Sequence, residues 1–291
     1  MTLLFIAALL PAIAVMIFVY TKDKAEPEPI ALVLRVFGLG AVSGLVAGFV
    51  ESILISLFEA VIPPGILLLG VTYFIGVAAV EEACKFFCLN TVKNNPAFNY
   101  LFDAIVYSVA AALGFAALEN VFYVMEGGFE TAVMRAIFSV PGHAADGVVM
   151  GVFYGIARQH ELHGRKEKAT QSYVLAFLLP MIEHGFYDAA LSTESDIMML
   201  IAMAVDLAFI GLAFALVRRK SVTDEPLHPY MSTPQQQPPL AQGQNPYAQM
   251  QQQMPPQQVP QYTAGSANWF CPNCGAPNTE NFCINCGTKR P

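Results

Sequence analysis

The chain has 291 residues, of which 55% are hydrophobic and only 13% are charged, and its formal net charge at pH 7 is -7. Soluble domains carry about 25% charged residues, so this composition excludes an ordinary soluble enzyme and indicates an integral membrane protein. Lys and Arg form no basic stripe of the kind that binds nucleic acid, so we expect no nucleic-acid partner.

Seven apolar stretches are long enough to cross a lipid bilayer, which takes about 20 helical residues. We expect helices, because an exposed sheet edge finds no hydrogen-bond partner in lipid. The first stretch lacks both a basic start and a small-residue cleavage site, so we expect a retained span rather than a secretory signal. The fold class is therefore an all-α polytopic membrane protein. The predicted spans are 2–20, 30–57, 66–90, 103–125, 132–157, 172–191 and 197–217.

Basic residues occur only in alternate connections between these spans. The connections near residues 58–65, 126–131 and 192–196 hold no Lys or Arg. Because Lys and Arg accumulate in cytoplasmic loops, we expect the N-terminus outside and the C-terminus in the cytoplasm of a prokaryotic cell membrane. The basic residues of the other connections are Lys22, Lys24, Lys93, Arg158, Arg165, Lys166, Lys168 and Arg218 to Lys220.

Two spans carry glycines at four-residue spacing. Small residues four apart allow helix backbones to approach closely in lipid, so we expect both stripes to pack against neighbouring helices. The stripes are Gly40, Gly44 and Gly48 in the second span and Gly147, Gly151 and Gly155 in the fifth.

The third span holds two adjacent carboxylates and a lysine in an otherwise apolar run, Glu81, Glu82 and Lys85. A charge near the bilayer centre costs at least about 2.5–3.5 kcal/mol, so such residues are usually paired and often functional. Lys85 lies four and three residues after the two acids and can pair with either, which leaves the other as a candidate general base. The alternative is a Glu–Lys pair that only fixes the helix register.

Three later spans carry further polar residues. Glu119 lies well inside the fourth span, which holds no Lys or Arg, so it must be neutral or find a partner on another helix. His143 and Asp146 lie one turn apart in the fifth span. His184 and Asp188 share one helix face in the sixth, where an acid can orient an imidazole. A lone histidine can be a simple interhelical contact, but polar groups on four successive spans predict one shared site.

Two imidazoles and several carboxylates are compatible with two mechanisms. In the first, His143, His184 and Glu119 hold a zinc ion that acidifies a water molecule. In the second, Glu81 or Glu82 activates the water directly while the histidines and their acidic partner orient it and stabilise the oxyanion. The H-E-x-x-H signature of zinc proteases is absent, so no local motif decides between the two.

Straight helices predict an axial mismatch within this site. At 1.5 Å per residue, Glu81 lies about 12 Å from the cytoplasmic end of its helix, while Glu119 and Asp188 lie nearer the outer ends of theirs. Helix tilt or shifted helix ends would close this gap. Glu51, towards one end of the second span, is expected at the membrane interface.

The C-terminal part of the chain has a different composition. Residues 221–267 are rich in Pro, Gln and Met, which predicts a flexible linker. Residues 268–291 hold two Cys-x-x-Cys-Gly units, which predict a closed zinc ribbon; disulfides are the alternative, disfavoured in the cytoplasm. Such a site is expected to be structural or to dock a cytoplasmic protein partner. The predicted zinc ligands are Cys271, Cys274, Cys283 and Cys286.

The membrane motifs resemble those of the PrsW intramembrane proteases. Glu81-Glu82-Ala83-Cys84-Lys85 is similar to the E-E-x-x-K motif of that family, and Phe115 to Glu119 is similar to its F-x-x-x-E motif. His143 matches the isolated histidine, and His184 to Asp188 matches H-x-x-x-D. The resemblance covers residues 30–220, and the family is similar to a wider superfamily with the CAAX prenyl endopeptidases and Abi proteins.

The resemblance implies hydrolysis of peptide bonds within or beside the lipid bilayer, in membrane-anchored protein substrates. It leaves the mechanism open, because family members are called metalloproteases whereas the superfamily includes glutamate-dependent enzymes without a catalytic metal. The site residues that we expect are Glu81, Glu82, Lys85, Glu119, His143, His184 and Asp188.

Two other classes of function use the same residues. An ion-coupled transporter could relay ions through the carboxylates and histidines, but it should show inverted repeats with broken helices, and the sequence shows none. A non-catalytic scaffold could recruit a partner through the ribbon. The organisation that we expect is a PrsW-like membrane protease domain over 1–220, a linker over 221–267 and a cytoplasmic zinc ribbon over 268–291.

Overall fold

The computed structural model describes residues 2–227, 269–270 and 277–278. The chain divides into two compact units, residues 1–231 and 232–291. In the second unit, strands β1 (Trp269–Phe270) and β2 (Pro277–Asn278) pair in antiparallel orientation, with Trp269 opposite Asn278. The predicted zinc ligands lie outside the described residues and remain a prediction: Cys271, Cys274, Cys283 and Cys286.

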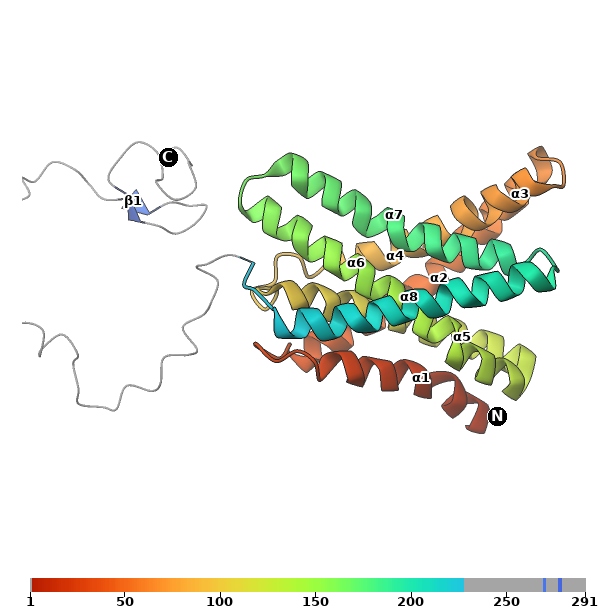
Figure 1. Ribbon diagram of the computed structural model, residues 1–291, viewed down its shortest axis with the longest axis horizontal. Coiled ribbons are helices and arrows are strands. Elements are labelled where there is room, and N and C mark those ends of the chain that lie inside the picture. The colour runs from red at the N-terminus through yellow and green to blue at the C-terminus, as the bar shows by residue number, and fades with distance from the viewer. Residues whose placement is uncertain (1, 228–268, 271–276, 279–291) are drawn as a thin grey trace, which may run out of the picture. The chain divides into compact units, whose positions relative to one another are not determined.

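The first unit is a bundle of helices in its described residues (Figure 1). Three consecutive segments, α3, the π-helix η1 and α4, together form the third predicted span. The helices are α1 (Thr2–Tyr20), α2 (Ile30–Val61), α3 (Ile66–Gly70), η1 (Val71–Ala78), α4 (Ala79–Asn90), α5 (Leu101–Ile137), α6 (Ser139–Leu162), α7 (Lys166–Leu191) and α8 (Asp196–Val222).

Six helical stretches among the described residues are long and apolar enough to cross a membrane, whereas the sequence predicts seven spans. The difference lies in Leu101–Leu162, a stretch of 62 residues that counts once although it contains α5 and α6. These two helices run antiparallel. Gly147 of α6 lies against Val109 of α5, and Gly155, about two turns further along α6, lies against Leu101.

Helix α5 forms the centre of the bundle. Every residue from Phe102 to Ala117 is buried, and α1, α2 and α6 pack around this segment. A helix that is apolar on all sides can lie in the interior or against lipid, and the burial of this segment places α5 in the interior. The surrounding helices instead expose large apolar side chains, as a lipid-facing surface requires; examples are Leu10, Phe49 and Leu207.

Glycines allow the close helix packing that the sequence predicts. A Cβ atom on Gly151 of α6 would lie 2.6 Å from the Cα atom of Ile105 on α5, closer than packed atoms can approach. Gly40 of α2 meets the backbone of Ala111 on α5 in the same way. The stripe in α2 does not continue to Gly48, which has open space beside it and lines the cavity described below.

The last helix continues into a short packed segment. The Ser221 hydroxyl donates a hydrogen bond to the carbonyl of Lys22, which follows α1. The amide of Leu227 donates to the carbonyl of Asn99, 2.8 Å away, just before α5. This packed end continues to Leu227, the last described residue of the helical unit. The predicted domain boundary at residue 220 therefore lies within it.

Candidate active site

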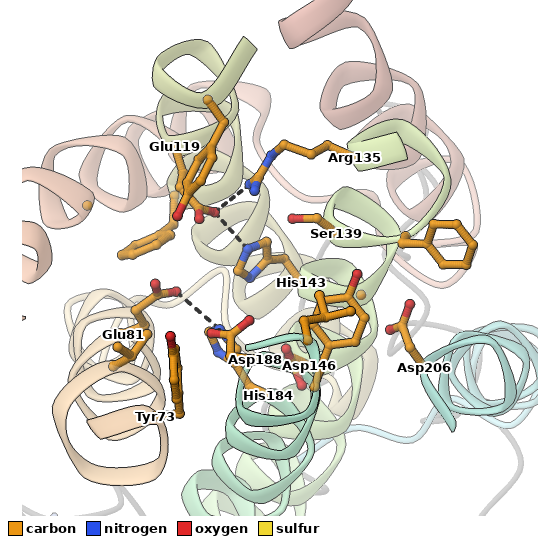
Figure 2. A pocket seen from close by; sticks show the side chains of 18 of the residues that line it. Tyr73, Glu81, Glu119, Arg135, Ser139, His143, Asp146, His184, Asp188 and Asp206 are labelled. Atoms are coloured by element: carbon orange, nitrogen blue, oxygen red, sulfur yellow. Dashed lines mark hydrogen bonds and ion pairs between the residues drawn. The ribbon is translucent and has the colours of Figure 1, made fainter. Parts of the chain in front are cut away.

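Polar side chains from four helices meet around one cavity inside the bundle, of about 890 Å³. Figure 2 shows that they converge on it from different elements. The predicted site residues that line it are Glu81 of α4, Glu119 of α5, His143 of α6, and His184 and Asp188 of α7. The other two predicted site residues, Glu82 and Lys85, do not line it and are 0% exposed.

The Lys85 ammonium group joins α4 to α6. Its Nζ atom lies 2.6 Å from Oε1 of Glu82, 3.3 Å from Oε2 of Glu81 and 3.0 Å from Nδ1 of His143. An ammonium group has three donors and no acceptor, so each contact takes one proton and Nδ1 of His143 accepts. The lysine therefore pairs with both acids and with a second helix, which is more than a pair that fixes helix register.

The partner of Glu119 is a cation that sequence reasoning missed. Because Nδ1 of His143 accepts from the lysine, its Nε2–H points at Oε2 of Glu119, 2.9 Å away. The same oxygen lies 2.8 Å from Nη2 of Arg135, whose Nε lies 2.7 Å from the Asn120 side-chain oxygen. Arg135 reaches back because α5 turns at Gly128, where φ is 75°.

Both ring nitrogens of His184 face carboxylates. Nδ1 lies 3.0 Å from Oε1 of Glu82, while Nε2 lies 3.3 Å from Oδ2 of Asp188 and 3.8 Å from Oε2 of Glu81. The predicted contact between His184 and Asp188 is confirmed. The His184 and His143 rings are perpendicular, with centroids 5.3 Å apart, so the two imidazoles and the α4 acids form one cluster.

The π-helix η1 ends three residues before Glu81. Single π-helical turns inside α-helices are often found at functional sites. Tyr73 of η1 lines the cavity. A Cβ atom on Gly185 of α7 would lie 2.8 Å from the ring of Phe74, so this glycine lets α7 approach η1 and brings His184 next to Glu81.

The cluster has the donor atoms of a metal site. One ligand atom from each of Glu81, Glu82, His143 and His184 lies within 4.8 Å of the others, and all four residues are buried. Oε2 of Glu82 is buried without a hydrogen-bond partner among the described residues. Two imidazoles and two carboxylates fit a zinc-like ion. The predicted set of ligands was His143, His184 and Glu119. The group in the structure contains Glu81 and Glu82 of α4 instead of Glu119.

Further acids line the cavity besides the predicted site residues, and one of them, Asp146, was among the polar groups predicted to share the site. Glu51 of α2, which was expected at the membrane interface, lines the cavity. Asp146 of α6 and Asp206 of α8 also line it. Each of the three has one buried carboxylate oxygen without a hydrogen-bond partner among the described residues. A single acid inside an apolar span is the sequence signal that could have identified Glu51 and Asp206.

Comparison with known proteins identifies the family. The family described as PrsW family intramembrane metalloprotease matches residues 28–217, well over half of the chain. The chain belongs to the PrsW family. The match ends five residues before the end of α8 and contains every residue of the candidate site. The resemblance predicted from the motifs is confirmed, and so is an intramembrane protease that works in a membrane environment on protein substrates.

Curated relatives support the same family. Protease PrsW of Oceanobacillus iheyensis is 33% identical over 218 residues, which is 75% of this chain and 96% of the relative. Protease PrsW of Bacillus subtilis is 34% identical over 191 residues, 65% of this chain and 83% of the relative. Protease PrsW of Geobacillus kaustophilus is 34% identical over 184 residues, 62% of this chain and 76% of the relative. No solved structure matches the chain.

Proposed function

We propose that this PrsW-family protease cleaves membrane-anchored protein substrates in the cavity, with Glu81 activating the attacking water. The observation that carries the proposal is that Glu81, Glu119, His143 and His184 line the same cavity. Glu81 is held by Lys85 on one side and open to the cavity on the other. A carboxylate in that position can accept a proton from a water molecule beside it.

Glu82 and Lys85 are positioning residues in this scheme. The Glu82 carboxylate accepts from Lys85 and lies at hydrogen-bond distance from Nδ1 of His184. It therefore fixes the imidazole whose Nε2 faces the cavity between Glu81 and Asp188. A proton on that nitrogen stabilises negative charge that develops on the scissile carbonyl.

A divalent metal ion fits the same residues. Glu81, Glu82, His143 and His184 would hold it, with Nδ1 of His143 released from the Lys85 ammonium group that it now contacts. When bound, the ion would supply a Lewis acid that polarises the carbonyl of the substrate. Glu119 and Arg135 orient His143 through its Nε2–H with or without an ion. Such contacts behind a ligand fix its tautomer and ring orientation.

We also propose seven membrane crossings, with α5 and α6 each crossing once. Their antiparallel packing supports this count. An odd number of crossings puts the two termini on opposite sides of the membrane. The positive-inside rule then places the N-terminus outside and the C-terminal zinc ribbon, with zinc on its four cysteines, in the cytoplasm, where a partner protein can reach it. The basic connections lie at one end of the bundle, which supports this orientation.

The test is cleavage of a single-span substrate reconstituted with the full-length protease in liposomes. Glu81→Gln, Glu82→Gln and His184→Ala should each lower the cleavage rate at least about 100-fold, because each removes a group that acts on the reacting atoms or holds one that does. The matched control is Glu126→Gln, which removes an exposed carboxylate and should leave the rate unchanged. Expression and thermal unfolding of each variant show whether it folds.

Wild-type rates in all three folded variants would overturn the site assignment. Chelation then separates the mechanisms. Activity that persists after all metal has been removed supports water activation by glutamate alone. Activity that is lost on chelation, and is restored by zinc in a variant whose ribbon cysteines are replaced, supports a metal held in the membrane cluster.

A further inference from the structure

A second group of buried carboxylates lies at one end of the bundle, away from the protease site. Asp23 follows α1, Asp103 lies in the first turn of α5 and Asp224 follows α8. One ligand oxygen from each of the three lies within 4.8 Å of the others. Asp103 is 0% and Asp23 is 5% exposed. Asp103 precedes Glu119 by 16 residues, about 24 Å along a helix, so the two groups are separate.

Backbone amides hold each carboxylate in a fixed orientation. In all three residues one oxygen accepts hydrogen bonds from main-chain N–H groups of the adjoining segments. These contacts leave the second oxygen of each residue free to point elsewhere. They are Asn99 N and Tyr100 N to Asp103 Oδ2 at 2.7 and 2.6 Å, Phe102 N to Asp224 Oδ1 at 2.9 Å, and Glu28 N to Asp23 Oδ2 at 3.2 Å.

The second oxygens accept no hydrogen bond from an N–H or O–H donor among the described residues, although the Asp103 carboxyl also contacts the Glu28 carboxyl. They are Oδ1 of Asp23, Oδ1 of Asp103 and Oδ2 of Asp224, and all three atoms are buried. The side-chain oxygen of Asn99 is also buried without a hydrogen-bond partner among the described residues, and Asn99 is 3% exposed. Buried acceptors without partners are rare in folded proteins, so four from adjoining segments indicate a ligand that accepts lone pairs.

No side-chain cation contacts these carboxylates directly in the described residues, although Lys220 lies near enough to Asp224 to act on its charge. Among residues 2–227, no Lys or Arg forms an ion pair with Asp23, Asp103 or Asp224. Two further acids of the connection between α1 and α2 add negative charge: Glu26 accepts from the Asn99 amide and Glu28 from the Tyr107 hydroxyl.

We propose that these oxygens bind one hard divalent cation, Mg²⁺ or Ca²⁺. Three carboxylates and an amide carbonyl, without thiol or imidazole, are the donor set of these ions rather than of zinc. The cation would join the connection between α1 and α2, the start of α5 and the segment after α8. It would therefore fasten the first and last helices to the central helix, independently of peptide cleavage.

The test is the thermal unfolding of the purified full-length protein, stripped of metal and then supplied with MgCl₂, CaCl₂ or NaCl of matched ionic strength. A cation that binds only the folded state should raise Tm by about 5–10 °C at a hundredfold excess over its Kd. NaCl should give no comparable shift. Asp23→Asn and Asp224→Asn should each remove most of the shift while preserving side-chain size.

Two control variants test whether the rise in Tm comes from a cation bound by this group of carboxylates. Glu225→Gln removes an exposed neighbouring charge and should keep the full shift, and so should His184→Ala in the protease site. The proposal is overturned if neither Mg²⁺ nor Ca²⁺ raises Tm more than NaCl does. It is also overturned if both aspartate variants respond like wild type. The relative size of the Mg²⁺ and Ca²⁺ shifts then shows which ion the site prefers.

Discussion

At the scale of single residues, Arg135 has the clearest dependence on the folded chain. It follows Glu119 by 16 residues, a separation of about 24 Å on a straight helix. The turn at Gly128 brings its guanidinium group back to Glu119 and Asn120. Its planar fork contacts both side chains at once through two different nitrogens held in fixed geometry, which a lysine ammonium group does not offer.

Arg135→Gln should lower the cleavage rate about 10–100-fold, the usual effect of removing a group that orients a functional side chain. The loss should appear in kcat rather than KM, because Arg135 acts through Glu119 on His143. Arg135→Lys should restore part of the rate by keeping the charge. Arg219→Gln is the matched control, because Arg219 is exposed at the end of α8; equal rates in all four proteins would contradict the positioning role.

Sequence spacing identifies contacts within one helix and misses contacts that the fold creates. The pairs of Lys85 with Glu81 and Glu82, and of His184 with Asp188, are three or four residues apart and follow from helical geometry. The contact of Lys85 with His143 and the group of Asp23, Asp103 and Asp224 join distant segments. The residues in these contacts are too far apart in the sequence for helical spacing to reveal them, so only the structure shows the contacts.

At the scale of elements, the sequence predicts the presence of the helices better than the positions of their ends. The predicted fourth span ends at residue 125, whereas α5 continues through the turn at Gly128 to Ile137. The axial mismatch predicted between Glu81 and Glu119 does not separate them, because Lys85 contacts Glu81 and His143, and His143 contacts Glu119. The π-helix before Glu81 adds a local change of helix geometry that residue periodicity does not reveal.

The packing of α6 on α5 gives a test at this scale. Gly151→Ala should destabilise the protein by about 1–3 kcal/mol, because the added methyl group would meet the Ile105 backbone and force the helices apart. Gly211→Ala on α8 is the matched control. Nothing lies within 4 Å of that position, so alanine should be neutral or stabilise by up to about 1 kcal/mol. Denaturant unfolding in detergent measures both, and equal stabilities would contradict the close α5–α6 approach.

At the scale of the whole helical unit, the connections that carry Lys and Arg lie at one end of the bundle. Lys22 lies beside the end of α8, where the Ser221 hydroxyl binds its carbonyl. The Lys93 ammonium group lies 2.9 Å from the Glu161 carboxylate, which places the connection after α4 beside the end of α6. In Figure 1 the ends of α1, α6 and α8 and the start of α5 lie on the same side of the view. The connections that the positive-inside rule groups together are therefore neighbours in space.

This grouping predicts which connections an impermeant reagent reaches. An epitope tag inserted after Gly164, between α6 and α7, should bind antibody only after the cells are permeabilised, because that connection belongs to the basic end. The same tag inserted after Glu194, between α7 and α8, should bind antibody on intact spheroplasts. Both sites are exposed, so neither insertion disrupts buried packing, and retained cleavage activity verifies folding. Labelling of both tags on the same side would mean that α7 does not cross the membrane, and the reverse pattern would invert the orientation of the protease.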